Sequence, residues 1–382
     1  MKREAVYIAM QPEAENSYWA ANISEGIRRA AKDAQLETVT VDLSGDLSDV
    51  VKDRFVLTAG NDADWLDAAL GRLSENGAFP IVVNACMLPI QRHRYSGVVF
   101  EGKGTVILGA KEFLNIVPNE LLSASGFCRT ALLGVNPSSI TDRVKAEAFS
   151  RAKCRGEREI IWSPGRLDEC VCEFASQFSE SGFDSVICAN DTVAICLLHF
   201  LSSAEVGFSE SLNIVGMGDS FVGASLGLTS IMFDYRKMGE MSVRLYCDLL
   251  KYGTSCRITM SLPCELVVRK TAHFAEKSGE EHGASDVVRP KRHYFDGGEV
   301  QNIINVETVL QSVDPHDRES LFGIARGENC GSVAERLFFS DRAVRYRLSN
   351  IVKRFGFRDR TELENALRRA LGEKRGKQNG KD

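Results

Sequence analysis

The chain has 382 residues, of which 44% are hydrophobic and 26% are charged, as is typical of a soluble globular protein with two or three domains. No segment approaches the run of about 20 apolar residues that a membrane helix requires. Residues 1–20 lack the apolar core and cleavage pattern of a signal peptide. We therefore expect a cytoplasmic protein without a membrane partner.

Charge is distributed unevenly along the chain. From residue 314 to the end, 16 Lys and Arg stand against 11 Asp and Glu, a net charge of +5, so the first 313 residues carry −10 of the total of −5. An acidic body with a basic end predicts that only one part of the chain faces an anion. The eleven cysteines form no C-x-x-C pair, and the six histidines lack metal-ligand spacing. We expect free thiols, no metal and no cofactor.

Short apolar runs alternate with amphipathic segments over the first 270 residues. We expect strands at 5–10, 39–43, 54–58, 80–84, 97–100, 129–136, 159–162, 184–189, 213–217, 228–233 and 262–268. We expect helices at 18–34, 65–74, 103–114, 142–153, 167–180 and 236–250, and one that begins near Asp191. This alternation indicates an α/β fold with parallel sheets and helices on both faces. Right-handed crossovers bring the carboxyl ends of the strands to one edge, where ligands bind.

The alternation stops after Thr271. Residues 272–299 are charged and poor in aliphatic side chains, as is typical of a linker that is flexible for at least part of its length. A helix is expected at 300–313. The last residues, 373–382, are typical of a disordered basic tail.

Residues 331–361 contain a pattern that is typical of DNA-binding proteins. A short amphipathic segment at 332–337 precedes a turn and a longer helix at 341–355, with Ser340 placed as its N-cap. One face of this helix carries the apolar stripe Val344, Leu348, Ile351 and Phe355. The opposite face carries Arg342, Arg345, Arg347, Lys353 and Arg354, against the single acid Asp341. We expect this helix to enter the major groove of double-stranded DNA, the alternative being a solvated cationic face.

Several polar side chains follow strands at the expected ligand edge. Asn190 and Asp191 stand where a strand ends and a helix begins; Asp191 either accepts hydrogen bonds from a ligand or caps the helix. Asp219 follows the 213–217 strand. Arg143, at the start of the 142–153 helix, is a ligand contact or a solvated cation. Asn136 and Met10 end their strands and are weaker candidates.

Residues 128–271 resemble the effector-binding domain of the LacI/GalR family. The resemblance is carried by FDSVICANDTVAICLLHFL, LNIVGMGDS, LGLTSIMFDYRKMGEMSVRLYCDLL, LPCELVVRKTA, ALLGVNPSSITDRVKAEAFSRA and, earlier in the chain, ENSYWAANISEGIRRAAK. It implies the two-lobed fold of type I periplasmic binding proteins, with three crossing segments as a hinge. Lobe one would comprise about 1–122 and 235–259, and lobe two about 123–234 and 260–271, which together form an effector-sensing domain at 1–271.

The same resemblance implies that Arg143 and Asp191 contact an effector in the cleft between the lobes. The family usually has two acids where this chain has Gly218 and Asp219. Tyr18 and Trp19 would begin the first helix at the cleft, where an aromatic ring stacks on a sugar or a base. A place in the core is the alternative for both.

Residues 314–371 resemble the LuxR-type helix-turn-helix through DPHDRE, ARG, SVAERL, SDRAVRYRLSNIVKRFGF and RDRTEL, in that order. The resemblance implies a small all-α DNA-binding domain at 300–372. It departs from the family at Ala343, where Thr is usual, and at Arg347, where His is frequent. The implied DNA-binding residues are Ser340, Arg342, Arg345, Tyr346, Arg347, Ser349, Asn350 and Lys353. Among these, Arg345, Tyr346 and Ser349 would face base edges, whereas Arg342, Arg347 and Lys353 would meet phosphates.

These features predict a transcription regulator, a homodimer that responds to a sugar, polyol or other polar metabolite. No dinucleotide fingerprint, Walker loop or G-x-S-x-G motif is present, and we find no catalytic constellation. An α/β enzyme and a solute-binding protein that use the same cleft are the alternatives. Since the DNA-binding domain follows the linker, we expect control through oligomerisation or shielding of this domain rather than through a tight lever.

Overall fold

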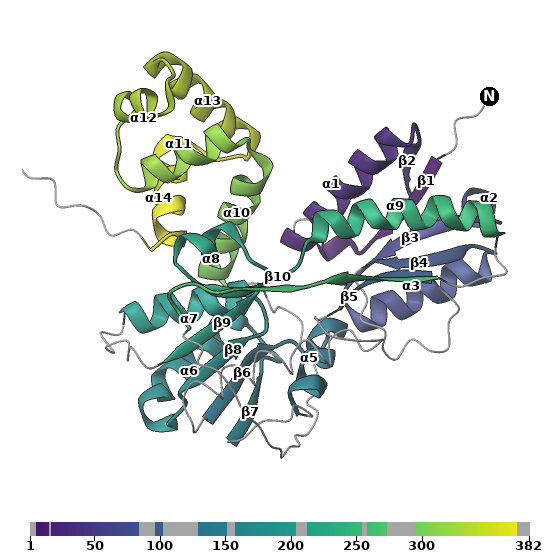
Figure 1. The fold of residues 1–382 in the computed structure, drawn as a ribbon, viewed down its shortest axis with the longest axis horizontal. Helices are drawn as coiled ribbons and strands as arrows, with labels where there is room; N and C mark the ends of the chain where they lie inside the picture. The colour runs from purple at the N-terminus through teal and green to yellow at the C-terminus, as the bar shows by residue number, and fades with distance from the viewer. Residues whose placement is uncertain are drawn as a thin grey trace, which may run out of the picture.

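Two six-stranded sheets form the body of the protein (Figure 1). The computed structural model describes residues 5–14, 17–83, 96–101, 129–150, 157–203, 212–253, 258–272, 295 and 297–372. The first sheet has the strand order β11-β5-β4-β3-β1-β2, and the second has the order β12-β10-β9-β8-β6-β7. The described pairs are parallel, apart from the antiparallel pair β10 and β12. The predicted α/β class is confirmed.

Lobe one is the first sheet with its helices. Its strands are β1 (Ala5–Met10), β2 (Glu37–Thr40), β3 (Phe55–Ala59), β4 (Phe79–Val83), β5 (Ser96–Glu101) and β11 (Thr259–Pro263). Its helices are η1 (Pro12–Ala14), α1 (Tyr18–Asp33), α2 (Ser48–Val51), α3 (Ala63–Glu75) and α9 (Tyr235–Tyr252). Leu57 faces α1 and α9, whereas its neighbour Val56 packs with α2 and α3, because successive strand residues point to opposite faces.

The helices α1 and α9 cross at two glycines. A Cβ atom at Gly26 would lie 2.0 Å from the carbonyl oxygen of Arg236, and one at Gly239 would lie 2.2 Å from that of Ile23. Only glycine permits this close approach of two helix backbones. The carboxyl-terminal part of lobe one is thereby fastened to its first helix.

Lobe two is the second sheet with its helices. Its strands are β6 (Arg129–Val135), β7 (Glu157–Trp162), β8 (Ser185–Cys188), β9 (Asn213–Met217), β10 (Thr229–Met232) and β12 (Glu265–Val267). Its helices are α5 (Ile140–Ser150), α6 (Leu167–Ser181), α7 (Asp191–Ser203) and α8 (Phe221–Ser225).

Two predicted boundaries need correction. The strand expected at 262–268 is divided into β11 and β12 around Cys264. Because β11 pairs with β5 along its whole length, the chain returns to lobe two after Pro263 and not near residue 259. The helix expected at 103–114, most of the linker expected at 272–299 and the basic tail at 373–382 lie outside the described residues.

Five helices form the C-terminal helical unit. They are α10 (Gly298–Ser312), α11 (Pro315–Ala325), α12 (Cys330–Leu337), α13 (Asp341–Arg354) and α14 (Arg360–Ala370). Ser340 caps α13 as predicted, since its hydroxyl accepts a hydrogen bond from the Ala343 N–H at 3.1 Å. Val344, Leu348 and Ile351 of the predicted stripe are buried.

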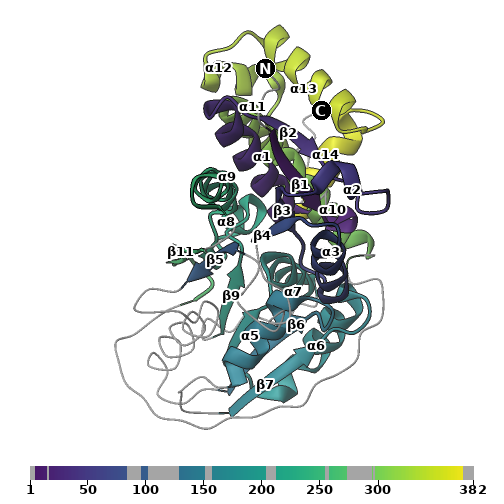
Figure 2. The same ribbon diagram turned by 90° about the vertical axis from the view of Figure 1, so that its right-hand side faces the viewer.

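The helix α10 is packed on lobe two. Its apolar residues Val300, Ile303, Val306, Val309 and Leu310 are buried in the same apolar cluster as β8, β9 and α7. In Figure 1, α10 lies beside α8 of lobe two, and both views show α12 and α13 at the end of the unit away from lobe two (Figures 1 and 2). The helical unit and lobe two therefore share one core, a connection that the sequence patterns did not predict.

Within the described residues, no helix combines the length and apolar composition needed to span a bilayer. The same residues contain no group of three or more His, Cys, Asp or Glu arranged to hold a metal ion.

Candidate functional site

The two lobes meet directly at one side of the expected ligand edge. The loop after β3 and the loop after β6 pair through two backbone hydrogen bonds, from the Ile140 N–H to the Asn61 carbonyl at 2.8 Å and from the Ala63 N–H to the Ser138 carbonyl at 3.1 Å. The Thr141 hydroxyl also donates to Asn61 Oδ1 at 2.8 Å. This side of the edge is thus held by contacts between the lobes.

Two predicted residues lie beside this contact. The Asn136 side chain accepts from the Ser138 N–H at 2.9 Å and so shapes the loop after β6. Arg143 is exposed, and its guanidinium forms no hydrogen bond or ion pair with any residue that the structure describes. Of the two, Arg143 is the more exposed and carries the charged donors that a polar ligand could use.

Two further residues at this edge were not predicted from the sequence. Gln11 Oε1 accepts from the N–H groups of Asn61 and Asp62 at 2.9 and 3.0 Å, which fixes the loop after β3. Lys145 Nζ lies 2.8 Å from Asp142 Oδ1 and donates to the Ala189 carbonyl at 2.7 Å. The i, i+3 spacing of Asp142 and Lys145 was the available signal.

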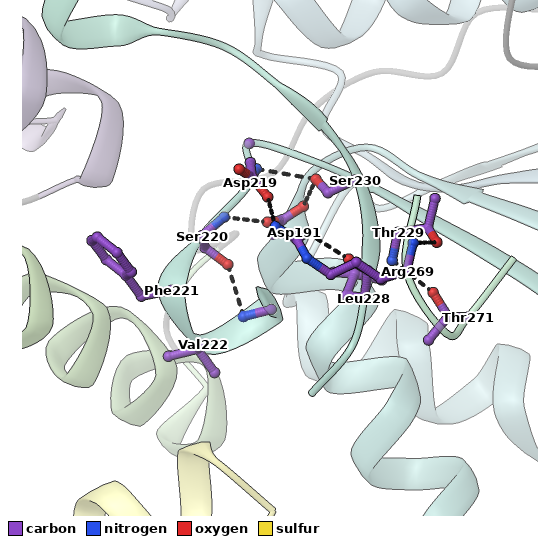
Figure 3. A network of polar contacts seen from close by, with 12 residues as sticks. Asp191, Asp219, Ser220, Phe221, Val222, Leu228, Thr229, Ser230, Arg269 and Thr271 are labelled. Carbon is purple, nitrogen blue, oxygen red and sulfur yellow. Dashed lines mark hydrogen bonds and ion pairs between the residues drawn. The ribbon is translucent and has the colours of Figure 1, made fainter. Parts of the chain in front are cut away.

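Asp191 is buried at the carboxyl end of β8, with a relative exposure of 4% (Figure 3). Its Oδ2 accepts from the Ser220 N–H and its Oδ1 accepts from the Ser230 hydroxyl, both at 2.6 Å. It does not cap α7, because Asn190 Oδ1 accepts from the Val193 N–H at 3.0 Å. Burial raises the pKa of the Asp191 carboxyl, although these hydrogen bonds oppose the shift. Asp191 therefore joins the start of α7 to the loop after β9 and to β10 within lobe two.

Asp219 belongs to that loop and is half-buried. Its Oδ1 forms an ion pair with Arg269 Nη2 at 2.7 Å, and its N–H donates to Ser230 Oγ at 3.0 Å. The preceding Gly218 has a φ of +140°, which L side chains rarely adopt. This backbone conformation accounts for the glycine at position 218.

Tyr18 and Trp19, although adjacent in the chain, lie in different surroundings. The Tyr18 hydroxyl donates to the Gly218 carbonyl at 3.1 Å, so it links α1 of lobe one to the loop after β9. Its ring meets Tyr235 edge to face at 5.7 Å. Trp19 packs against the apolar core of lobe one, the alternative that the sequence left open, and Met10 packs there also. Only Tyr18 stands between the lobes.

Glu307 of α10 reaches this loop from the helical unit. Its Oε1 accepts from the Phe221 N–H and its Oε2 from the Val222 N–H, both at 2.9 Å. Burial raises the pKa of the Glu307 carboxyl, against the hydrogen bonds that it accepts. The guanidinium of Arg318 in α11 lies over the Phe221 ring, 4.0 Å from its centroid. An acid on the otherwise apolar face of α10 was a signal for this contact, although the partner is 86 residues away.

The outer face of α13 is open to solvent. Its exposed residues are Arg342, Arg345, Tyr346, Ser349, Asn350, Lys353 and Arg354. Arg345 pairs with Asp341 at 2.6 Å, one turn earlier on the same helix. The described part of the body does not cover this face.

Arg347 points toward α11 instead. It pairs with Asp317 at 2.5 Å and with Asp314, and its guanidinium lies 5.5 Å from the centroid of the Phe339 ring. These contacts hold α13 against the beginning of α11. The guanidinium predicted to meet a phosphate is engaged within the protein.

Solved structures of LacI-family transcriptional regulators have the same fold as the body. One from Enterococcus faecium with bound ribose has a TM-score of 0.51 at 14% sequence identity, over 71% of this chain and 100% of that chain. One from Silicibacter pomeroyi has a TM-score of 0.53 at 18% identity, over 70% and 98%. The lac repressor dimer bound to operator and the anti-inducer ONPF has a TM-score of 0.52 at 16% identity, over 71% and 95%.

No protein-family model matches the sequence, and no curated protein matches it. At these identities, the likeness to the solved structures shows the fold. The body is a two-lobed α/β domain of the type found in LacI-family regulators and periplasmic binding proteins, as the resemblance in the sequence predicted.

Proposed function

We propose that this protein is a ligand-responsive transcription regulator that binds double-stranded DNA. The observation that carries the proposal is the exposed cationic face of α13, on a helical unit attached to a body with the fold of LacI-family regulators. A regulator of this kind needs a surface for nucleic acid and a separate site for a signal, and the two parts of the chain supply them.

On the DNA side, α12 and α13 act as a LuxR-type helix-turn-helix, with α13 in the major groove. Arg345 contacts the edge of a base, most favourably a guanine. To do so it gives up its exposed ion pair with Asp341. Arg342 and Lys353 neutralise phosphates and position the helix. Arg347 holds α13 on α11 and does not contribute its charge to DNA.

On the signal side, a small polar metabolite binds between the lobes. Arg143 and Tyr18 are the candidate contacts, because each lies at the edge where the strands end and presents a polar group toward the other lobe or toward solvent. Asp191 binds the loop after β9 through the Ser220 N–H, and Asp219, within that loop, pairs with Arg269. The structure neighbour with ribose makes a sugar one candidate class for this chain.

The regulator acts as a homodimer in the cytoplasm. A dimer presents two copies of α13 to two half-sites, which is how most readers of this type recognise an operator. A ligand changes DNA binding only through its different affinity for two arrangements of the lobes.

Selection of DNA from a random-sequence library with the full chain tests the DNA side. We expect enrichment of a defined sequence, and binding that weakens steeply as salt increases. Arg345→Ala should reduce discrimination between selected and random duplexes by about 1–3 kcal/mol. Arg342→Ala should weaken binding to both duplexes equally.

The control for these variants is Arg28→Ala, which removes the same charge from the surface of α1 in lobe one. An equal loss from Arg28→Ala, or the absence of any enriched sequence, would contradict the proposal. A thermal-shift screen of polar metabolites tests the signal side: Arg143→Ala should abolish a shift that Arg28→Ala retains.

A further inference from the structure

The helix α10 touches both lobes at the edge where the proposed ligand binds. It packs on lobe two through its apolar face, and its first turn is joined to α7 by a contact between Glu299 Oε1 and His199 Nδ1 at 2.8 Å. It also contacts α1 of lobe one. A helix that belongs to the DNA-binding unit is therefore in contact with both halves of the sensor.

The loop after β9 is held from two sides. Asp191 accepts the Ser220 N–H from beneath, and Glu307 accepts the next two N–H groups, those of Phe221 and Val222, from α10. Three successive backbone donors are thus bound by two buried carboxylates on different elements. A displacement of this loop must either move Glu307 with it or break these hydrogen bonds.

Gln311 extends the contact to lobe one. Its Nε2 donates to Glu307 Oε1 at 2.7 Å, and its Oε1 accepts from Asn22 Nδ2. The same Asn22 amide donates to the Tyr18 carbonyl at 2.9 Å. The Tyr18 hydroxyl in turn donates to Gly218 in the loop after β9. The contacts therefore form a closed circuit through α1, α10 and this loop. We call this set the polar ring; its members are Tyr18, Asn22, Gly218, Phe221, Glu307 and Gln311.

We propose that the polar ring makes the placement of α10, and of the helical unit that follows it, depend on the position of lobe one relative to lobe two. The inference rests on the proposed function and supplies its coupling element. A ligand that moves α1 relative to the loop after β9 breaks the Tyr18–Gly218 or the Asn22–Gln311 contact. The apolar face of α10 meanwhile keeps the helix on lobe two, so the unit changes its orientation without leaving the body.

The coupling is orientational because α13 remains uncovered while α10 is docked. A dimer that binds two half-sites needs its two recognition helices at a fixed separation. A less firmly held α10 therefore lowers the affinity for an operator with two half-sites. The helical unit must then lose conformational freedom when it binds DNA, and this entropy cost reduces the binding free energy.

Asn22→Ala and Gln311→Ala in the full chain, alone and together, test the proposal. Asn22 belongs to lobe one, so its effect on DNA binding must be transmitted. The matched control is Ser24→Ala, two residues further along α1, whose hydroxyl contacts Met10 Sδ within lobe one. Two readouts are measured: amide hydrogen exchange of α10 and residues 218–222, and affinity for the duplex that the wild-type chain selects from a random library.

We expect each single variant to speed exchange in the last two turns of α10 by about tenfold and to weaken binding to the selected duplex by about fivefold or more. The double variant should lose less affinity than the two single losses added together, because both substitutions remove the shared Asn22–Gln311 contact. Ser24→Ala should stay within about twofold of wild type in both readouts.

Wild-type values for Asn22→Ala in either readout would overturn the proposal, as would faster exchange without a change in affinity. If the wild-type chain selects no duplex, the proposed function fails by itself. The exchange measurement then decides separately whether lobe one controls the placement of α10.

Discussion

Tyr18 of lobe one donates a hydrogen bond to the carbonyl of Gly218 in lobe two, with 3.1 Å between the oxygen atoms. Burial raises the pKa of the Tyr18 hydroxyl well above its usual range, so this group remains a donor throughout the physiological range. The Gly218 peptide is buried, and its carbonyl receives this bond across the gap between the lobes. The Tyr18 hydroxyl thus joins the two lobes through a hydrogen bond.

Tyr18→Phe should remove this hydrogen bond between the lobes. The substitution keeps the ring against Tyr235 and removes only the hydroxyl, so the free energy of unfolding should fall by about 1 kcal/mol. Urea denaturation measures the change. Tyr346→Phe, at an exposed position on α13, is the control and should have no effect on stability. Equal stability of Tyr18→Phe and wild type would show that the hydroxyl contributes nothing to interlobe contact.

Leu310→Ala should destabilise the helical unit and lobe two together. Leu310 is fully buried in the core that they share, so its truncation should cost about 2–5 kcal/mol. Native-state hydrogen exchange should show faster opening in both β8 and α13. Leu70→Ala, in the separate cluster of α3 and α5, should leave α13 protected. Faster opening of α13 alone after Leu310→Ala would mean that the unit unfolds independently.

The raised pKa of Glu307 predicts a specific dependence of stability on pH. Between the pKa of an unfolded Glu, about 4.3, and the higher folded pKa, the folded protein binds more protons than the unfolded chain. This contribution is fully present below about pH 4 and is lost as pH rises through the folded pKa. The free energy of unfolding of wild type, minus that of Glu307→Gln, should therefore decrease as pH rises.

Urea denaturation at several pH values from about 4 to 8 measures this difference. Glu335→Gln, at an exposed position on α12, controls for loss of a charge. A difference that increases with pH would mean that the hydrogen bonds from Phe221, Val222 and Gln311 outweigh burial.

Two arginines on α13 should behave differently in DNA binding. Arg342→Ala should reduce the slope of log affinity against log salt by about 0.9, because one phosphate contact is lost. Arg347→Ala should leave the slope unchanged and lower stability by about 1 kcal/mol, since Asp314 and Asp317 lose their partner. Fluorescence anisotropy at several salt concentrations gives the slopes. Equal slopes for the two variants would remove the distinction between them.

The sequence was informative wherever a pattern was local. The apolar stripe of α13 and its Ser340 cap follow from spacings within one helix, and both are present in the structure. The α/β body followed from the alternation of strands and helices. The helix α8 was missed because five residues are too few for a helical period to show.

The candidate site was harder to predict because its contacts join distant positions. Asp191 was placed correctly at a strand end, but its partners Ser220 and Ser230 come from another loop and another strand. The helix α10 was predicted from its apolar spacing. That spacing did not indicate that its apolar face packs on lobe two. Sequence periodicity defines which face is buried but not what covers it.

The shared core of α10 and lobe two sets where the chain can be recombined with other proteins. A chimera joined within residues 272–299 would carry α10 to a foreign receptor, where its valines and leucine would meet solvent, and would strip lobe two of its cover. A joint placed between Val313 and Asp314 leaves α10 with its receptor and transplants only α11–α14. That joint in turn separates α10 from α14, where Asn302 Nδ2 donates to the Ala366 carbonyl at 3.1 Å. Because α10 packs on both sides, a functional chimera has to carry α10 together with lobe two and with α11–α14.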